Sequence, residues 1–125
     1  MFLIKDDLTI CITRGDVGDI IVTPKLRDGT PYTFQAGDVV RFNVFKRKEC
    51  ACVVIRKDVS ATENTESVTV SLTSEDTRIG EIINKPVDYW YEVEMNPETK
   101  PQTLIGYDEA GEKIFRLYPE GGDIQ

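Results

Sequence analysis

The chain has 125 residues, 40% of them hydrophobic and 9% aromatic, so it can bury a core and does not have the composition of a disordered protein. It carries 15 basic and 22 acidic residues, and this net charge of −7 argues against binding to a nucleic-acid backbone. It contains no histidine, which excludes Ser-His-Asp triads, histidine-activated cysteines and histidine-ligated zinc.

The first third of the chain reads as short β-strands separated by turns. Apolar and polar residues alternate over 8–13, and this run stops at Arg14-Gly15-Asp16. A second strand is expected over 20–23, closed by a proline. Because Asp28-Gly29 is a strong turn signal, we expect residues 25–34 to form a hairpin.

The middle of the chain holds the clearest alternation. After Gly37-Asp38, the side chains of Val40, Phe42 and Val44 are expected on one face of a strand. Further strands are expected over 51–57, which is rich in valine and isoleucine, and over 67–72.

One segment reads as helical, and three strands follow it. Residues 73–80 combine a capping residue, early acids and a final glycine, so we expect one or two turns of helix there. In a strand over 89–95, Tyr89 and Tyr91 face one way and Trp90 faces the other. Strands over 102–105 and 113–117 are expected to pair around a turn.

Many short strands with turn signals between them are typical of an all-β sandwich or barrel. We expect one domain over residues 1–117, followed by a flexible tail or the start of a linker over 118–125.

Cysteine usage and charge runs suggest neither a metal site nor a nucleic-acid surface. Cys50 and Cys52 are poorly spaced for a bridge on one strand and Cys11 is distant, so reduced thiols are the simplest expectation. As half of a metal site, the Cys50/Cys52 pair lacks a second pair. The run Lys46-Arg47-Lys48 reads as a solvated hairpin end.

The N-terminal residues 1–7 have no basic segment followed by a long apolar stretch, so no signal peptide is expected. No run in the sequence approaches the roughly 20 apolar residues of a membrane span. We therefore expect no membrane partner and no export by the general secretory route.

Two motifs that suggest chemistry also have ordinary structural explanations. Glu75-Asp76 is the sharpest carboxylate pair, but acids at this position favour the start of a helix, and no second group supports acid–base catalysis. Arg14-Gly15-Asp16 spells an integrin-binding tripeptide, yet it ends a strand, where glycine and aspartate form turns. We expect no catalytic residue, metal or cofactor.

The densest aromatic cluster, residues 89–91, is the best candidate for a contact. We expect core packing for one face of this strand, and a protein or sugar contact for Trp90 on the other. Phe45 is a second outward-facing bulky residue. Glu92 and Glu94 are the acids that could bond sugar hydroxyls beside Trp90.

The order of motifs resembles a known family. The quoted stretches are Arg14-Gly15-Asp16, Asp28-Gly29-Thr30-Pro31-Tyr32, Gly37-Asp38-Val39-Val40-Arg41-Phe42-Asn43-Val44, Leu72-Thr73-Ser74-Glu75-Asp76-Thr77, and the ending from Gly106-Tyr107-Asp108 to Glu120-Gly121-Gly122. This order is similar to the immunoglobulin-like N-terminal domain of baseplate upper proteins of phages and prophages of Gram-positive bacteria.

The resemblance implies an immunoglobulin-like antiparallel β-sandwich. It also implies a structural or adaptor role in a phage tail, with other baseplate proteins as partners, possible homo-oligomers, and a virion location after synthesis in the bacterial cytoplasm. In that family the domain heads a longer chain, so this sequence reads as a small adaptor protein or as a fragment.

Three functional hypotheses follow. The leading one is a tail module that binds proteins through sheet faces and strand edges. The alternative is a carbohydrate-binding module for cell-surface polysaccharide. An enzyme is disfavoured, because no nucleophile, base and orienting group can be assembled without histidine.

Overall fold

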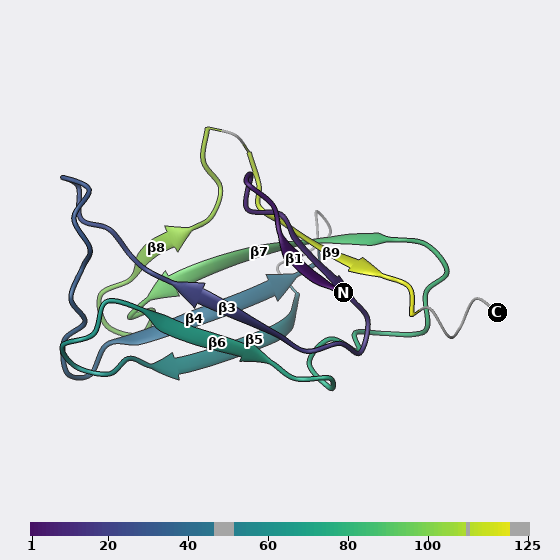
Figure 1. Cartoon of the computed structure of the whole chain (residues 1–125), viewed down its shortest axis with the longest axis horizontal. Helices are drawn as coiled ribbons and strands as arrows, with labels where there is room; N and C mark the ends of the chain where they lie inside the picture. Colours follow the sequence, from purple (N-terminus) through teal and green to yellow (C-terminus); the bar gives the residue numbers. More distant parts are fainter. Residues whose placement is uncertain (47–51, 110, 121–125) are drawn as a thin grey trace.

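A computed structural model describes residues 1–46, 52–109 and 111–120, and within them every regular element is a strand (Figure 1). The predicted all-β class is confirmed. The strands are β1 (Phe2–Ile4), β2 (Ile10–Thr13), β3 (Gly18–Val22), β4 (Val39–Phe45), β5 (Val53–Ser60), β6 (Val68–Leu72), β7 (Val87–Met95), β8 (Gln102–Ile105) and β9 (Ile114–Tyr118).

The larger sheet is organised around β7, its longest strand. Its order is β1-β2-β9-β7-β4-β5, and β8 also pairs with β7. Along one edge of β7 lies β4, with Phe42 opposite Val93. Along the other edge lie two strands in succession, with β9 beside the first half of β7 and β8 beside the second half.

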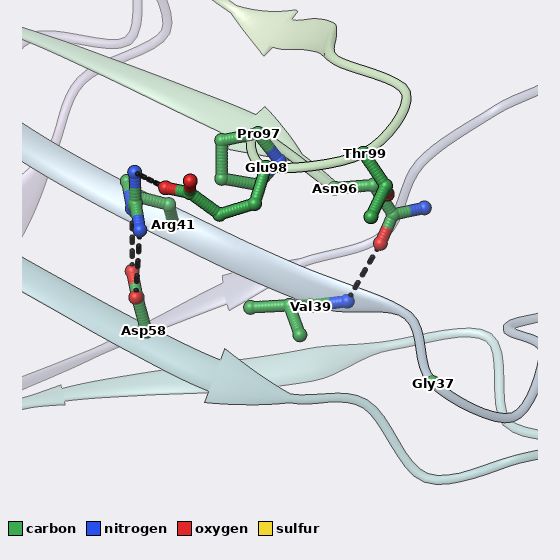
Figure 2. A pocket seen from close by; sticks show the side chains of 8 residues that line it. All are labelled: Gly37, Val39, Arg41, Asp58, Asn96, Pro97, Glu98 and Thr99. Atoms are coloured by element: carbon green, nitrogen blue, oxygen red, sulfur yellow. Dashed lines mark hydrogen bonds and ion pairs between the residues drawn. The ribbon is translucent and has the colours of Figure 1, made fainter.

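The turn that leaves β7 is held by Asn96 (Figure 2). Its φ of 51° turns the chain toward β8, a conformation that asparagine tolerates better than most residues. Its side-chain oxygen accepts a 2.9 Å hydrogen bond from the amide of Val39, and its side-chain nitrogen donates at 3.0 Å to the buried carboxylate of Asp38. The carboxylate also accepts bonds from the Tyr32 hydroxyl at 2.7 Å and the Gln35 amide at 2.8 Å.

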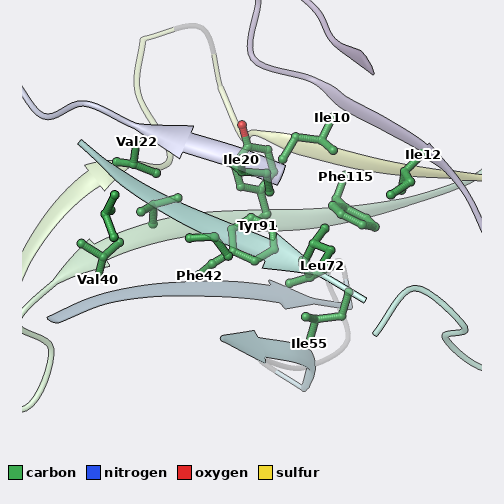
Figure 3. Packing of buried hydrophobic residues seen from close by; sticks show 14 of the residues in the cluster. Ile10, Ile12, Ile20, Val22, Val40, Phe42, Ile55, Leu72, Tyr91 and Phe115 are labelled. Atoms are coloured by element: carbon green, nitrogen blue, oxygen red, sulfur yellow. The ribbon is translucent and has the colours of Figure 1, made fainter. Parts of the chain in front are cut away.

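A second, two-stranded sheet of β3 and β6 contributes to the same core as the larger sheet. Leu72 of β6 is buried in one cluster with Phe42, Tyr91 and Phe115 of the larger sheet (Figure 3). Val70 of β6 belongs to the same cluster. The ring of Phe42 lies 5.6 Å from that of Tyr91 and 6.3 Å from that of Phe115, between centroids. The fold is therefore sandwich-like, as the strand pattern predicted.

The alternation predicted for the central strand is confirmed, with one exception. Val40, Phe42 and Val44 are fully buried on the core side, and Arg41 is half-buried on the other. Asn43, on the outward side, is also buried, because its amide oxygen accepts a 3.0 Å hydrogen bond from Arg56 of β5. This hydrogen bond from the adjacent strand offsets the cost of removing the polar side chain from water.

The prediction of a wholly antiparallel sandwich was wrong at one pair of strands. β2 pairs in parallel with β9, with Ile10 opposite Phe115 and Ile12 opposite Leu117. β1, which no alternation in the sequence indicated, adds to the other edge of β2. The larger sheet is therefore mixed.

The expected final hairpin was also wrong. β8 and β9 do not pair with each other, because both pair with β7, one after the other along the same edge. The connection between them leaves the sheet, as Figure 1 shows above β7. It contains a narrow turn closed by reciprocal backbone bonds between Asp108 and Gly111.

The helix expected over residues 73–80 is a turn instead. The carboxylate of Asp76 accepts a bond from the Thr73 amide at 2.9 Å, and the Thr73 hydroxyl accepts one from the Asp76 amide at 3.1 Å. This reciprocal pair has the chemistry of a capping box. The same residues that can begin a helix here close a single turn between β6 and β7.

The expected hairpin over residues 25–34 is reduced to a tight loop. Leu26 donates to the carbonyl of Thr30, and one isolated bridge joins Lys25 to Pro31. The Asp28-Gly29 turn is present, with a φ of 91° at Gly29. Prolines on both sides of the loop limit ladder pairing, since proline cannot donate a backbone hydrogen bond.

The cysteine expectation needs one correction. Cys11 is a buried free thiol, as expected. Cys52 is disulfide-bonded, so the prediction of a reduced thiol was wrong at this residue. Cys50 lies outside the described residues, as do Arg47 and Lys48 of the basic run. No helix in the described part of the chain is long and apolar enough to cross a bilayer.

The structure describes only the beginning of the expected C-terminal tail. Tyr118 is the last residue of β9, and Glu120 forms a 2.9 Å ion pair with Arg14. Residues 121–125 lie outside the described part of the chain.

Candidate binding surface

All four residues predicted to make contacts lie on one face of the larger sheet, the face turned away from β3 and β6. On β7, Trp90, Glu92 and Glu94 alternate with the buried residues of the core side. Phe45 of β4 lies directly opposite Trp90 across the strand pair. The strand pairing therefore places the four side chains on one continuous surface.

The structure adds a third ring to this surface. The ring centroids of Phe45 and Trp90 are 6.4 Å apart with an interplanar angle of 61°, and those of Trp90 and Tyr107 are 6.4 Å apart at 46°. Tilted packing at such distances is favourable for aromatic pairs. We call Phe45, Trp90 and Tyr107 the aromatic row.

Exposure differs along the aromatic row. Phe45 and Trp90 are half-buried, whereas Tyr107 is 75% exposed. Within the described residues, the indole Nε1 of Trp90 is shielded from solvent and has no hydrogen-bond partner. The row thus has a packed base and an exposed end.

Tyr107 was not predicted from the sequence to be a contact residue. It lies in the connection between β8 and β9, where no periodicity assigns a side chain to a face. Its only signal was an aromatic residue next to a turn, and such residues are common in loops. Its contact with Trp90 depends on the departure of this connection from the sheet.

The acids beside the aromatic row influence each other. Partial burial, the neighbouring charge of Glu94 and a hydrogen bond with that residue raise the pKa of Glu92 above its ordinary value. Glu92 therefore holds its proton more readily than an isolated glutamate does. Both carboxyl groups place oxygen atoms along the strand that carries Trp90.

The other charged side chains described on this face are largely paired with one another. Arg116 of β9 contacts Asp88 of β7 at 2.7 Å. Arg41 of β4 binds Asp58 of β5 through two bonds of 2.8 and 3.0 Å, and Glu98 at 2.9 Å. These bonds raise the pKa of Arg41 and lower that of Asp58.

A shallow cleft of about 190 Å³ lies at the end of this face (Figure 2). Its charged groups are Arg41, Asp58 and Glu98, which satisfy one another, as the dashed lines in the figure show. No group of three histidine, cysteine, aspartate or glutamate side chains in the described part of the chain is placed to hold a metal ion. The cleft is lined by Gly37, Val39, Arg41, Asp58, Asn96, Pro97, Glu98 and Thr99.

The two motifs with competing interpretations both have structural roles. Arg14 of the Arg-Gly-Asp tripeptide is 10% exposed and donates to the backbone carbonyls of Ile79 and Gly80, so it is not presented to a receptor. Asp76 closes its turn and forms a 3.0 Å ion pair with Lys57 of β5.

Comparisons of the chain with protein-family models, with curated proteins and with solved structures found no match. The functional argument therefore rests on the chain's own residues and on the motif order of its sequence.

Proposed function

We propose that this chain is a non-catalytic adaptor module of a phage or prophage tail, an immunoglobulin-like sandwich that binds other tail proteins. The observation that carries the proposal is the aromatic row on the outer face of the larger sheet. The motif order in the sequence supports the assignment to a tail, because it resembles that of baseplate domains.

The chemistry of this surface suits a protein partner. Tyrosine and tryptophan are enriched among the residues that dominate binding energy at interfaces, especially when water is excluded around them. Trp90 is flanked on β7 by Asp88, whose charge is paired with Arg116. Paired charges can border an interface without leaving a lone charge buried when a partner covers them.

A second candidate function is binding of a cell-surface polysaccharide, and Tyr107 is the observation that favours it. Its exposed ring extends the half-buried ring of Trp90, and the carboxyl groups of Glu92 and Glu94 follow on the same strand. Aromatic faces flanked by acids can stack on sugar rings and bond their hydroxyls.

Tryptophan fluorescence can test both functions, because Trp90 is the only tryptophan in the sequence. The chain is titrated with purified proteins encoded by adjacent genes and, separately, with host cell-wall polysaccharide. A saturable change with a tail protein supports the adaptor function, and one with polysaccharide alone supports the sugar binder. The adaptor function is abandoned if adjacent tail proteins leave both the fluorescence and the sedimentation of the chain unchanged.

Matched variants show whether the aromatic row is responsible. Tyr107→Ser removes the exposed ring and is expected to weaken binding at least about tenfold, the range of an interface hot spot. Ile82→Ser removes an exposed apolar side chain outside the row, 66% exposed, and should leave binding unchanged. If the two substitutions weaken binding equally, the aromatic row is not part of the binding surface.

A further inference from the structure

A groove separates the edges of the two sheets. It has a volume of about 400 Å³. One wall is the end of β3 and the residues that follow it, and the other wall is β8. Both strands are labelled in Figure 1. The residues that line it are Ile21, Val22, Thr23, Pro24, Lys25, Gln102, Thr103, Leu104 and Ile105.

Both strands that border the groove have an open edge. Within the described residues, β8 pairs with β7 alone and β3 pairs with β6 alone. A strand with one neighbour presents a row of unpaired N–H and C=O groups on its other side. Two such rows therefore border one cavity.

The larger sheet has one strand position beside β8 that no described strand fills. β9 and β8 follow each other along one edge of β7. The outer edge of β9 is covered by β2, whereas no described strand covers the outer edge of β8. A strand beside β8 would continue the row that β2 occupies beside β9.

We propose that this groove binds one extended segment of a partner protein, which adds to the sheet as a strand beside β8. This goes beyond the proposed function, since it assigns a second surface that uses none of the aromatic row. The occupant has aliphatic side chains at alternate positions and an acidic residue at an end.

The lining of the groove selects this chemistry. Ile21 is 68% exposed and, with the half-buried Leu104 and Ile105, offers aliphatic contacts to every second side chain of an added strand. In a chain with 22 acidic residues, the described lining holds no carboxylate, and its one charged group is Lys25. An acidic residue at the end of the occupant therefore complements the groove, whereas a basic one would be repelled.

The test uses a synthetic peptide of about ten residues, in which valines alternate with threonines between terminal aspartates, titrated into the full chain. Backbone amide resonances are followed by NMR, together with hydrogen exchange. Saturable shifts confined to residues 21–25 and 102–105, with slower exchange in β8, are the expected result. A peptide identical except that its central threonine is replaced by proline cannot complete the backbone pairing and should not bind.

Two substitutions and one control complete the test. Ile21→Thr and Lys25→Glu are each expected to weaken binding of the acidic peptide by about threefold to tenfold, since each removes one partly exposed contact. Lys85→Glu makes the same charge change before the opposite end of β7 and should leave the affinity unchanged. The proposal is overturned if the proline peptide binds equally well, if shifts appear only along β1 or the aromatic row, or if millimolar peptide gives no shift.

Discussion

Tyr91 donates its hydroxyl hydrogen to the backbone carbonyl of Leu8 and so joins the central strand β7 to the turn between β1 and β2. Leu8 has a φ of 72°, unusual for a residue with a branched side chain. Tyr91 is 3% exposed, and burial raises the pKa of its hydroxyl, so the group remains a donor throughout the physiological range. One hydrogen bond thus fixes a strained turn to the core.

Tyr91→Phe should lower the free energy of unfolding by about 1–2 kcal/mol, because the carbonyl of Leu8 loses its partner. Tyr89→Phe, two residues earlier on the same face but half-buried, is the control and should have a smaller effect. Urea denaturation followed by circular dichroism measures both. Equal losses would show that the Leu8 bond contributes nothing specific.

Asp38→Asn should destabilise the chain by about 1.5–3 kcal/mol at neutral pH, since hydrogen bonds to a charged acceptor are stronger than neutral ones. Burial alone would raise the pKa of Asp38, but bonds from Gln35, Asn96 and Tyr32 outweigh it and hold the pKa below its ordinary value of 3.8. A carboxylate with a lowered pKa contributes stability that is present above 3.8 and is lost as pH falls below it.

The difference between wild type and Asp38→Asn should therefore shrink below pH 3.8. Denaturation midpoints measured across an acid series check the sign. A difference that stays constant through this range would contradict the assigned role of the charged form.

Glu92→Gln should have the opposite sign, with an effect below about 1 kcal/mol because the site is partly screened by solvent. Burial and the charge of Glu94 raise the pKa of Glu92, so its ionised form opposes folding. The variant is then more stable than wild type at pH 7.5, and the two converge as pH falls and Glu92 takes up its proton. Thermal melts at pH 7.5 and 4.5 measure this, with Glu81→Gln on an exposed loop as the control.

Gly18→Ala should displace the ring of Phe2, which packs from β1 against Gly18 of β3. A Cβ at Gly18 would lie 2.5 Å from the Cδ1 atom of Phe2, closer than real contacts allow. We expect a loss of about 1–2 kcal/mol as the ring moves away. In a Phe2→Ala background the same change should be nearly neutral, which a double-mutant cycle would register as a coupling energy of about 1–2 kcal/mol.

Residue alternation was enough to locate most strands. Val40, Phe42 and Val44 are buried as predicted, because a half-buried strand can satisfy both faces only by alternating. β1 escaped notice, since three consecutive apolar residues carry no alternation. The segment starting at Thr73 was misread because threonine and aspartate bond backbone amides equally well in a turn and at a helix start.

Pairing was less predictable than strand position. The strands β8 and β9 follow a turn signal that favours a hairpin, yet each finds its hydrogen bonds on β7. That choice depends on the whole sheet and leaves no local mark. The same holds for the surface, where Phe45 and Trp90 were identifiable as outward residues but Tyr107 joined them only through the path of its loop.

The parallel pairing of β2 with β9 determines when the protein can fold. Ile10 leaves the ribosome early, but Phe115 opposite it follows only after every other strand-forming segment of the sheet except the rest of β9 has been made. Until then, the position between β2 and β7 has no occupant, and the edge of β2 that faces β9 is unpaired. The larger sheet can therefore close only after β9 has been made, and this pairing is a non-local contact of the kind that slows folding.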